Sequence, residues 1–328
     1  MDINRRTLIA AASAVPGFLL ASPLRAQLSY PNRPIRLVVP YPPGGGTDFF
    51  ARVVATPMGQ SLGQTIIVDN RPGAATAIGA ESVAHAAPDG HVFLLGDVAT
   101  FAANPSLYQK LAYNPGKDFS PITLTGRFAI VLLVNTKKLK VASVAQLVET
   151  ARKAPNSVDY ASGGIGNPFH LTSELFAQRA GIKLNHIPYK GAAPALQDLT
   201  NGQVGMMFVD FATARSQLAV PEIKALAVTS LSSLPSLPGV PTLAASGFPE
   251  FEAWAWQGFV APAGTGSDII ARLQKSYVAA VQDAEVRRKL TDAGIDILQS
   301  TPQEFAAYIV AETAKWGEVI KAANIKAD

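Results

Sequence analysis

The chain contains no cysteine, which excludes disulfide bonds, thiol nucleophiles and cysteine-ligated metal sites. Histidine is scarce as well, and the four residues of this type are His85, His91, His170 and His186. They form no His-Glu-x-x-His motif and no close pair in the sequence. The sequence therefore predicts neither a metal site nor a cofactor.

An excess of one charge is also missing. The 28 Lys and Arg residues nearly balance the 24 Asp and Glu residues, which leaves a net charge of +4 over 328 residues. No basic run carries interleaved aromatic residues, so the composition argues against nucleic-acid binding. Beyond the N-terminus, no segment has the roughly 18 uninterrupted apolar residues of a membrane-spanning helix. With 48% hydrophobic residues, the chain can still bury the core of one large or two medium domains.

Residues 1–26 have the three parts of an export signal. Arg5-Arg6 supplies the charged part, residues 7–20 are largely apolar, and Ala26 is a small residue before Gln27. The arginine pair followed by Thr-Leu-Ile resembles a twin-arginine signal, but an ordinary Sec signal can also contain two arginines. Both export routes stay open, and either one predicts that the mature chain lies in the periplasm.

A glycine-rich loop occupies residues 40–48, with the sequence Pro-Tyr-Pro-Pro-Gly-Gly-Gly-Thr-Asp. It follows an apolar run at residues 35–39 and precedes an amphipathic stretch from Phe49, so it should connect a strand to a helix. Glycines leave backbone N–H groups uncovered, and the helix N-terminus beside them carries about half a positive charge. Such a loop can bind an anion without Lys or Arg. It is not a nucleotide phosphate loop, because no Gly-Lys-Ser/Thr follows the glycines.

A second glycine-rich loop, at residues 161–170, repeats this arrangement with the sequence Ala-Ser-Gly-Gly-Ile-Gly-Asn-Pro-Phe-His. Asn167 is a typical helix N-cap, and Pro168 suits the first helical position. The loop lacks the Gly-x-Gly-x-x-Gly motif of dinucleotide sites, since Phe169 stands where the third glycine belongs. Either loop alone could be a turn without a ligand, but two of them could hold an anion between two lobes.

Predicted strands and helices alternate along the chain, which is typical of an α/β fold with parallel strands. The series starts again after an apolar strand at residues 129–134, and this predicts two lobes. We expect lobe 1 to comprise residues 27–128 and 255–328, and lobe 2 to comprise residues 129–254, with a ligand cleft between them. The last helix should begin at Thr301-Pro302-Gln303-Glu304, which has the pattern of a capping box.

A catalytic site would have to be built from few candidates. The sequence has no Gly-x-Ser-x-Gly motif, but Ser162 and His170 lie near enough in the second loop to leave a Ser–His hydrolase open. His170 could equally donate a hydrogen bond to a ligand or pack in the core. Asp48 suits the positive end of a helix, and Asp210 lies at the tip of another strand. Each of these acids could contact a ligand or be structural.

Several motifs together are typical of one family. They are Tyr30-Pro31, Pro34-Ile35, Pro42-Pro43-Gly44-Gly45-Gly46-Thr47-Asp48, Asn70-Arg71-Pro72-Gly73-Ala74, Ile78-Gly79-Ala80-Glu81, Ala87-Pro88-Asp89-Gly90, Asn104-Pro105-Ser106-Leu107-Tyr108, Pro188-Tyr189-Lys190-Gly191, Ala225-Leu226-Ala227-Val228-Thr229 and Ala261-Pro262-Ala263-Gly264-Thr265. Over residues 30–325 the chain resembles the Bug-type solute receptors, which are the substrate-binding proteins of tripartite tricarboxylate transporters.

The resemblance implies a two-lobed, type II periplasmic binding-protein fold that holds a carboxylate mostly through main-chain N–H groups of two glycine loops. Carried over to this chain, it implies a ligand-binding set from both lobes: Tyr41, Gly45, Gly46, Thr47, Asp48, Phe49, Thr100, Ser162, Gly166, Asn167, His170 and Asp210. The chain departs from the family pattern at Ile165 and Asn167 of the second loop. It also has Asp97-Val98-Ala99 where a small, hydroxyl-rich stretch is more usual, which puts an acid near the cleft.

The sequence thus predicts a non-catalytic periplasmic receptor for a small organic carboxylate, such as a di- or tricarboxylate or an aromatic acid. A dicarboxylate could use both loops, one for each end. The expected partners are the membrane permease subunits of a tripartite tricarboxylate transporter. A sensor kinase is the alternative partner, because the ligand site would look the same, and a Ser–His hydrolase is the alternative activity. We expect the protein to be a monomer, as is usual for a receptor whose lobes open and close.

Overall fold

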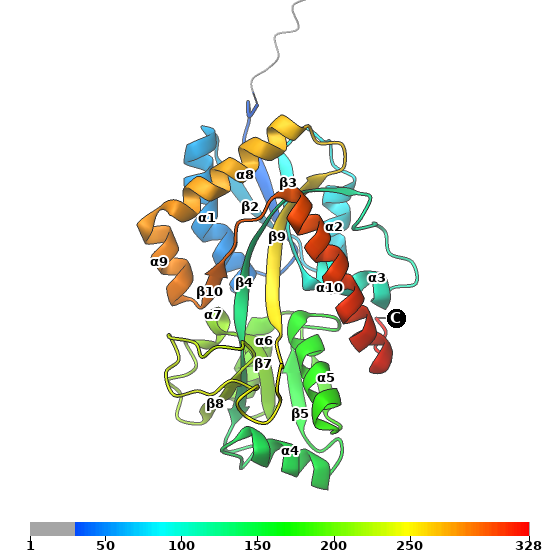
Figure 1. Cartoon of the computed structure of the whole chain (residues 1–328), viewed down its shortest axis with the longest axis vertical. Helices are drawn as coiled ribbons and strands as arrows, with labels where there is room; N and C mark the ends of the chain where they lie inside the picture. Colours follow the sequence, from blue (N-terminus) through cyan, green and yellow to red (C-terminus); the bar gives the residue numbers. More distant parts are fainter. Residues whose placement is uncertain (1–29, 328) are drawn as a thin grey trace, which may run out of the picture.

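The computed structural model describes residues 30–327, so the predicted export signal at residues 1–26 lies outside the described part of the chain. Figure 1 shows an elongated molecule with two halves, and the long strands β4 (Phe119–Asn135) and β9 (Trp254–Pro262) run between them. Within residues 30–327, no helix is long and apolar enough to cross a membrane.

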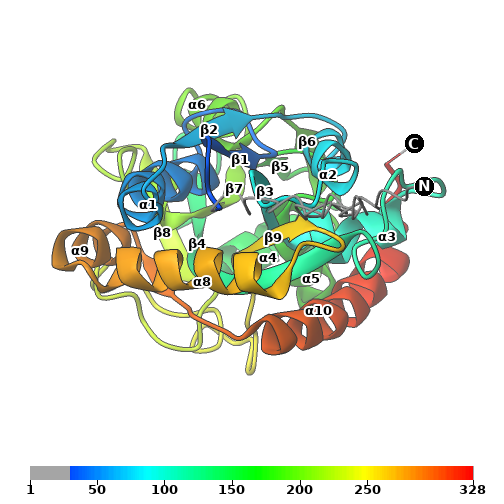
Figure 2. The same ribbon diagram turned by 90° about the horizontal axis from the view of Figure 1, so that it is seen from above.

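The upper half in Figure 1 is built on strands in the order β2-β1-β3-β9-β4. β1 is parallel to β2 and β3, whereas β9 is antiparallel to β3 and β4. The further strands of this half are β1 (Ile35–Val39), β2 (Ile66–Asn70), β3 (Val92–Asp97) and β10 (Ile295–Ile297). Its helices are α1 (Gly46–Leu62), α2 (Ala77–Ala84), the π-helix η1 (Ala99–Ala103), α3 (Asn104–Leu107), α8 (Ser267–Gln282), α9 (Ala284–Asp292) and α10 (Pro302–Ala322). From above, α8 lies beside α1, while α10 lies beside α3 (Figure 2).

The lower half continues the same sheet through β7, β5 and β6. β5 is parallel to β6 and β7, whereas β7 and β8 are antiparallel to β4. The strands are β5 (Asp159–Ser162), β6 (Asn185–Pro188), β7 (Met206–Asp210) and β8 (Ile223–Val228). The helices are α4 (Val144–Lys153), α5 (Pro168–Ala180), α6 (Ala192–Thr200) and α7 (Phe211–Ala214).

Strand β4 changes partners within its length. Up to Ala129 it pairs with β9, and from Ile130 it pairs with β7. The sequence predicted only the second part, at residues 129–134, as a strand. The first part was missed because its pairing with β9 shifts register near Pro121 and Gly126, and such irregularities interrupt the alternation by which strands are recognised.

Two predicted helix starts are confirmed. The Asn167 side chain caps α5 by accepting a hydrogen bond from the Phe169 N–H at 2.9 Å. At α10, Thr301 and Glu304 form a reciprocal capping box, in which each side chain accepts from the other residue's backbone N–H. Both caps provide acceptors for N–H groups that lack partners within the helix. Because this depends only on residues close in sequence, the helix starts could be predicted from the local sequence.

A buried acid ties α10 to β9. Glu312 accepts hydrogen bonds from the indole N–H of Trp256 at 2.6 Å and from that of Trp316 at 2.8 Å. The Trp256 ring stacks on Phe101 and meets Phe305 edge to face, in the layer between the sheet and α10. Because Trp256 is the third residue of β9, near the end of that strand that leads to the lower half, Glu312 helps to fix the strand in place.

Replacing Glu312 by Leu should lower the free energy of unfolding by about 1–3 kcal/mol for each indole N–H that loses its acceptor. The matched variant Glu312→Gln keeps an acceptor oxygen and should lose less. Urea unfolding of the wild-type protein and both variants measures the difference. Equal stability of the Leu and Gln variants would contradict this role for the carboxylate.

Candidate functional site

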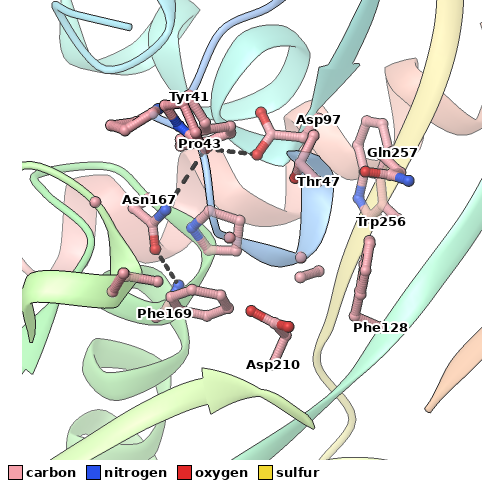
Figure 3. Close-up of a pocket in the computed structure, with 18 of the residues that line it drawn as sticks. Tyr41, Pro43, Thr47, Asp97, Phe128, Asn167, Phe169, Asp210, Trp256 and Gln257 are labelled. Carbon is pink, nitrogen blue, oxygen red and sulfur yellow. Dashed lines mark hydrogen bonds between the residues drawn. The ribbon is translucent and has the colours of Figure 1, made fainter. Parts of the chain in front are cut away.

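A cavity lies between the two halves, where β4 and β9 pass from one to the other (Figure 3). Its volume is about 630 Å³, counted to its open mouth. Residues from both halves line it: Tyr41, Pro42, Pro43, Gly45, Gly46, Thr47, Asp97, Phe128, Asn167, Pro168, Phe169, Gly191, Ala192, Ala193, Pro194, Asp210, Ala255, Trp256 and Gln257. No Lys, Arg or His is among these lining residues.

The first glycine loop brings the N-terminus of α1 to the cavity. The helix begins at Gly46, and its N-cap residue Gly45 has no side chain to cap it. Within residues 30–327, no protein acceptor pairs with the backbone N–H groups of Gly46 and Thr47. A Cβ on Gly46 would lie 2.6 Å from a carboxylate oxygen of Asp210, so only glycine fits this close approach. The loop therefore presents free N–H donors at the positive end of a 17-residue helix.

The second glycine loop uses most of its N–H groups internally. The Gly164 N–H donates to Ser162 Oγ at 3.1 Å, and the Gly166 N–H donates to His170 Nδ1 at 3.0 Å. The Asn167 N–H donates to the Gly164 carbonyl at 3.2 Å. Asn167 itself faces the cavity, where its amide Nδ2 donates to the Tyr41 hydroxyl at 3.5 Å across the two halves. This loop therefore contributes the Asn167 side-chain amide to the cavity, while most of its N–H groups are already paired within the loop.

The N-terminus of α6 supplies the free N–H groups that the second loop does not provide. Gly191, Ala192, Ala193 and Pro194 line the cavity, and α6 begins at Ala192 without a side-chain cap. Within the described chain, the N–H groups of Ala192 and Ala193 make no hydrogen bond to a protein acceptor. Sequence reasoning missed these residues, although a glycine between a strand and a helix was visible at Gly191. Its φ of 117° is one that other residues rarely adopt.

Two buried acids face the cavity from opposite halves. Asp97, at the end of β3, accepts from the Tyr41 hydroxyl at 2.6 Å and from the N–H and hydroxyl of Thr100. Asp210, at the end of β7, accepts from the N–H and hydroxyl of Thr213, each at 2.8 Å. Burial raises the pKa of both carboxyl groups. Gln257, on β9, is 1% exposed, and neither end of its side-chain amide has a partner within residues 30–327.

Six residues of the predicted ligand-binding set line this cavity, namely Tyr41, Gly45, Gly46, Thr47, Asn167 and Asp210. The other six do not line it, namely Asp48, Phe49, Thr100, Ser162, Gly166 and His170. On α1 the reason is helical geometry, because the side chains of Asp48 and Phe49 leave the first turn of the helix in directions away from the cavity. Asp48 instead pairs with Arg52 at 2.9 Å, and Phe49 is 37% exposed on the outer surface.

The remaining residues of the set support the cavity from behind. Thr100 is fully buried and holds the Asp97 carboxylate. Ser162 is also fully buried, and its Oγ lies 2.6 Å from Nε2 of His186, while within residues 30–327 it makes no hydrogen bond to His170. The hydrogen bond between Ser162 and His170 that the alternative Ser–His hydrolase would need is therefore not formed in this structure. Ser162 does not line the cavity, so its hydroxyl cannot meet a ligand bound there.

His170 and His186 stack face to face under the second glycine loop, with ring centroids 3.9 Å apart. Burial lowers the pKa of His170 to about 3, with a further contribution from His186, and burial lowers the pKa of His186 to about 4. Both rings are therefore neutral at physiological pH, which suits the role of His170 Nδ1 as a hydrogen-bond acceptor for the loop.

The free energy of unfolding should fall as the pH drops from 6.5 towards 4, because only the unfolded chain then protonates these histidines. Each tenfold difference in proton affinity between the two states is about 1.4 kcal/mol. The variant His186→Gln should show a shallower fall, whereas His85→Gln, at an exposed position, should follow the wild type. Chemical denaturation at a series of pH values measures the slopes, and identical slopes for all three proteins would contradict the expectation.

Comparison with known proteins identifies the relatives of this chain. Residues 50–325 match the TctC family, described as the tripartite tricarboxylate transporter family receptor. A UPF0065 protein from the tcbD-tcbE intergenic region of Pseudomonas sp. strain P51 is 36% identical over 322 residues, which cover 97% of this chain and 94% of that protein. BugT of Bordetella pertussis is 35% identical over 308 residues, which cover 94% of each.

Two solved structures share the fold closely. Rpa4515 of R. palustris, solved with adipate, has a TM-score of 0.86 and 35% identity, and the match covers 90% of this chain and 99% of that one. MatC of Rhodopseudomonas palustris, solved with bound malate, has a TM-score of 0.83 and 32% identity, covering 89% and 100%. The two-lobed periplasmic binding-protein fold expected from the sequence is confirmed, and so is the resemblance to the Bug-type receptors. The chain belongs to the TctC family of tripartite tricarboxylate transporter receptors.

Proposed function

We propose that this protein is a periplasmic receptor that captures a small organic carboxylate in the cavity between its two halves. The observation that carries the proposal is a pair of uncapped helix N-termini, those of α1 and α6, which reach one cavity from opposite sides. Their free N–H groups can hold a carboxylate where no basic side chain is present. Relatives with the same fold were solved with adipate and with malate, which supports a carboxylate ligand here.

The residues that line the cavity are the proposed ligand contacts. From the predicted set these are Tyr41, Gly45, Gly46, Thr47, Asn167 and Asp210, and to them we add Ala192, Ala193 and Gln257. Of the six other predicted residues, four act indirectly in this proposal. Thr100, Gly166 and His170 position contact residues, and Asp48 holds the first loop by accepting from the Gly44 N–H at 3.0 Å.

Capture would involve a hinge between the two lobes. We keep the lobe boundaries inferred from the sequence, residues 27–128 with 255–328 and residues 129–254. They fall inside β4 and next to the first residue of β9, the two strands that connect the halves. Contacts to a ligand from both lobes exist only when the lobes are together, so a ligand would favour the closed form.

Delivery requires a membrane partner, and we propose the permease subunits of a tripartite tricarboxylate transporter. The family description supports this choice over a sensor kinase. The receptor would act as a monomer that carries one ligand at a time. Co-purification of the tagged receptor with the permease subunits, in the presence and absence of ligand, tests the partnership.

A thermal-shift screen of the exported chain, residues 27–328, tests carboxylate capture. The panel contains dicarboxylates, tricarboxylates, hydroxy acids, aromatic acids, acidic amino acids and half-amides, with fully amidated analogues as controls. A ligand at 100 times its dissociation constant adds about 2.7 kcal/mol to the free energy of unfolding, which should raise the melting temperature by several degrees. Stabilisation by at least one acid and not by its full amide is the expected result. Absence of a shift with every acid would overturn the proposed function.

A charge placed at the α1 N-terminus should abolish capture. Gly45 has ordinary backbone angles, and a Cβ there would meet no atom within 4 Å, so Gly45→Asp fits without a clash. Its carboxylate would occupy the anion site and repel the carboxylate of the ligand. We therefore expect the affinity for the ligand to fall at least about tenfold, or 1.4 kcal/mol. The control Gly45→Ala adds bulk without charge and should retain binding. Calorimetric titration compares the two, and full binding by Gly45→Asp would exclude this loop as the site.

A further inference from the structure

One wall of the cavity presents hydrogen-bond acceptors of side chains, whereas the helix ends opposite present N–H donors. Asp97 on β3 and Gln257 on β9 are directly paired residues of neighbouring antiparallel strands. Paired residues of such strands point to the same face of the sheet, so the carboxylate and the amide stand side by side. Figure 3 shows both on the far side of the cavity from Asn167. The chemistry of this wall restricts the class of ligand that the cavity can bind. This argument rests on the function proposed above.

Gln257 is the least satisfied polar residue of this wall. The side chain is 1% exposed, and both its amide nitrogen and its amide oxygen lack a hydrogen-bond partner within residues 30–327. Buried amides in folded proteins are nearly always paired, because an unpaired one loses its hydration without compensation. An amide left unpaired at both ends beside a cavity indicates that a ligand group with both a donor and an acceptor completes it.

Asp97 adds a further acceptor to the wall. One carboxylate oxygen accepts two hydrogen bonds from Thr100, through its N–H and its hydroxyl, and the other accepts one from the Tyr41 hydroxyl, so the second oxygen can accept one more. Asp210 brings a second carboxyl group to the cavity from the other half, where it lies beside Gly46. No Lys, Arg or His lines the cavity to balance these acids. A second carboxylate on the ligand would be repelled here, whereas an N–H or O–H donor would find acceptors.

We propose that the ligand carries a carboxylate at one end and a hydrogen-bond-donating group, such as an amide, a hydroxyl or an ammonium, at the other. The carboxylate lies against the N–H groups of α1 and α6, and the donor lies against Asp97 and Gln257. A dicarboxylate that uses a glycine loop at each end, as the sequence suggested, fits this cavity less well. The acid at position 97 is one of the points at which this chain departs from the family pattern.

Matched ligand pairs test the inference by calorimetric titration of the wild-type protein. Each unbranched dicarboxylate of four to six carbons is compared with its half-amide, which has the same length and shape. At least one half-amide should bind about tenfold or more tightly than its parent dicarboxylate. Tighter or equal binding of every dicarboxylate would overturn the inference but leave carboxylate capture intact. Failure of all acids and half-amides to bind would instead count against the proposed function.

Two variants separate recognition from structure. Asp97→Asn exchanges an acceptor for a donor at constant shape, so it should shift the preference from half-amide towards dicarboxylate. Asp292→Asn makes the same charge change at an exposed position outside the cavity and should leave the preference unchanged. An unaltered preference in Asp97→Asn would contradict the assignment of this wall.

Gln257→Met removes the amide while keeping most of the side-chain volume. If the amide serves the ligand, the free protein should melt at a higher temperature, because an unpaired buried amide is gone. The same variant should bind the preferred half-amide more weakly. A purely structural amide would give the opposite result, a lower melting temperature with unchanged affinity, and that outcome would contradict the role proposed for Gln257.

Discussion

Backbone pairing between β4 and β9 is the constraint on which the arrangement of this molecule depends. Their register runs from Phe119 opposite Pro262 to Ala129 opposite Trp254, and beyond Ala129 β4 continues into the lower half. Each half therefore contributes strands to a sheet that it cannot complete alone. The helix ends that line the cavity come from α1 above and α6 below, so their distance from one another follows from these shared strands.

The cavity combines uncharged hydrogen-bond donors with two carboxyl groups. Its donors are N–H groups at helix ends and the Asn167 amide, and its acids are Asp97 and Asp210. Tyr41 joins the two kinds of group, since its hydroxyl accepts from Asn167 and donates to Asp97. Asp210 lies beside Gly46 at the α1 N-terminus, whereas Asp97 lies beside Gln257 on the neighbouring strand. A carboxylate held by the helix ends thus leaves Asp97 to accept from a donor group of the ligand, and this is the physical basis of the proposed selectivity.

Much of this structure could be predicted from the sequence where the signal is local. The glycines at residues 44–46, the Asn167 cap and the capping box at Thr301 each act within a few neighbouring residues, and each was read correctly. Half of the predicted site residues line the cavity, and all of these except Asp210 belong to one of the two glycine-rich loops. Asp48 and Phe49 were included because they adjoin the loop, but the turn of α1 directs Asp48 to Arg52 and Phe49 to the outer surface.

The parts that were missed depend on contacts between distant segments. Gln257 becomes a cavity residue only because β9 pairs with β3, some 160 positions earlier in the chain, as the register of Gln257 with Asp97 shows. Ser162 meets His186 and not His170 because β5 and β6 are neighbours in the sheet. No spacing along the chain encodes such pairings, so these contacts could not be predicted from the sequence.

The free N–H groups at the start of α1 and α6 belong to the main chain, and this has a consequence for evolution. Most codon changes alter a side chain and leave the peptide N–H where it was. Under the proposed function, the ability to bind a carboxylate would survive most point mutations, while positions such as Asp97 and Gln257 remained free to change. Gene duplication followed by drift at a few wall positions could then produce receptors for many different acids from one scaffold, without any lineage passing through a form that binds nothing.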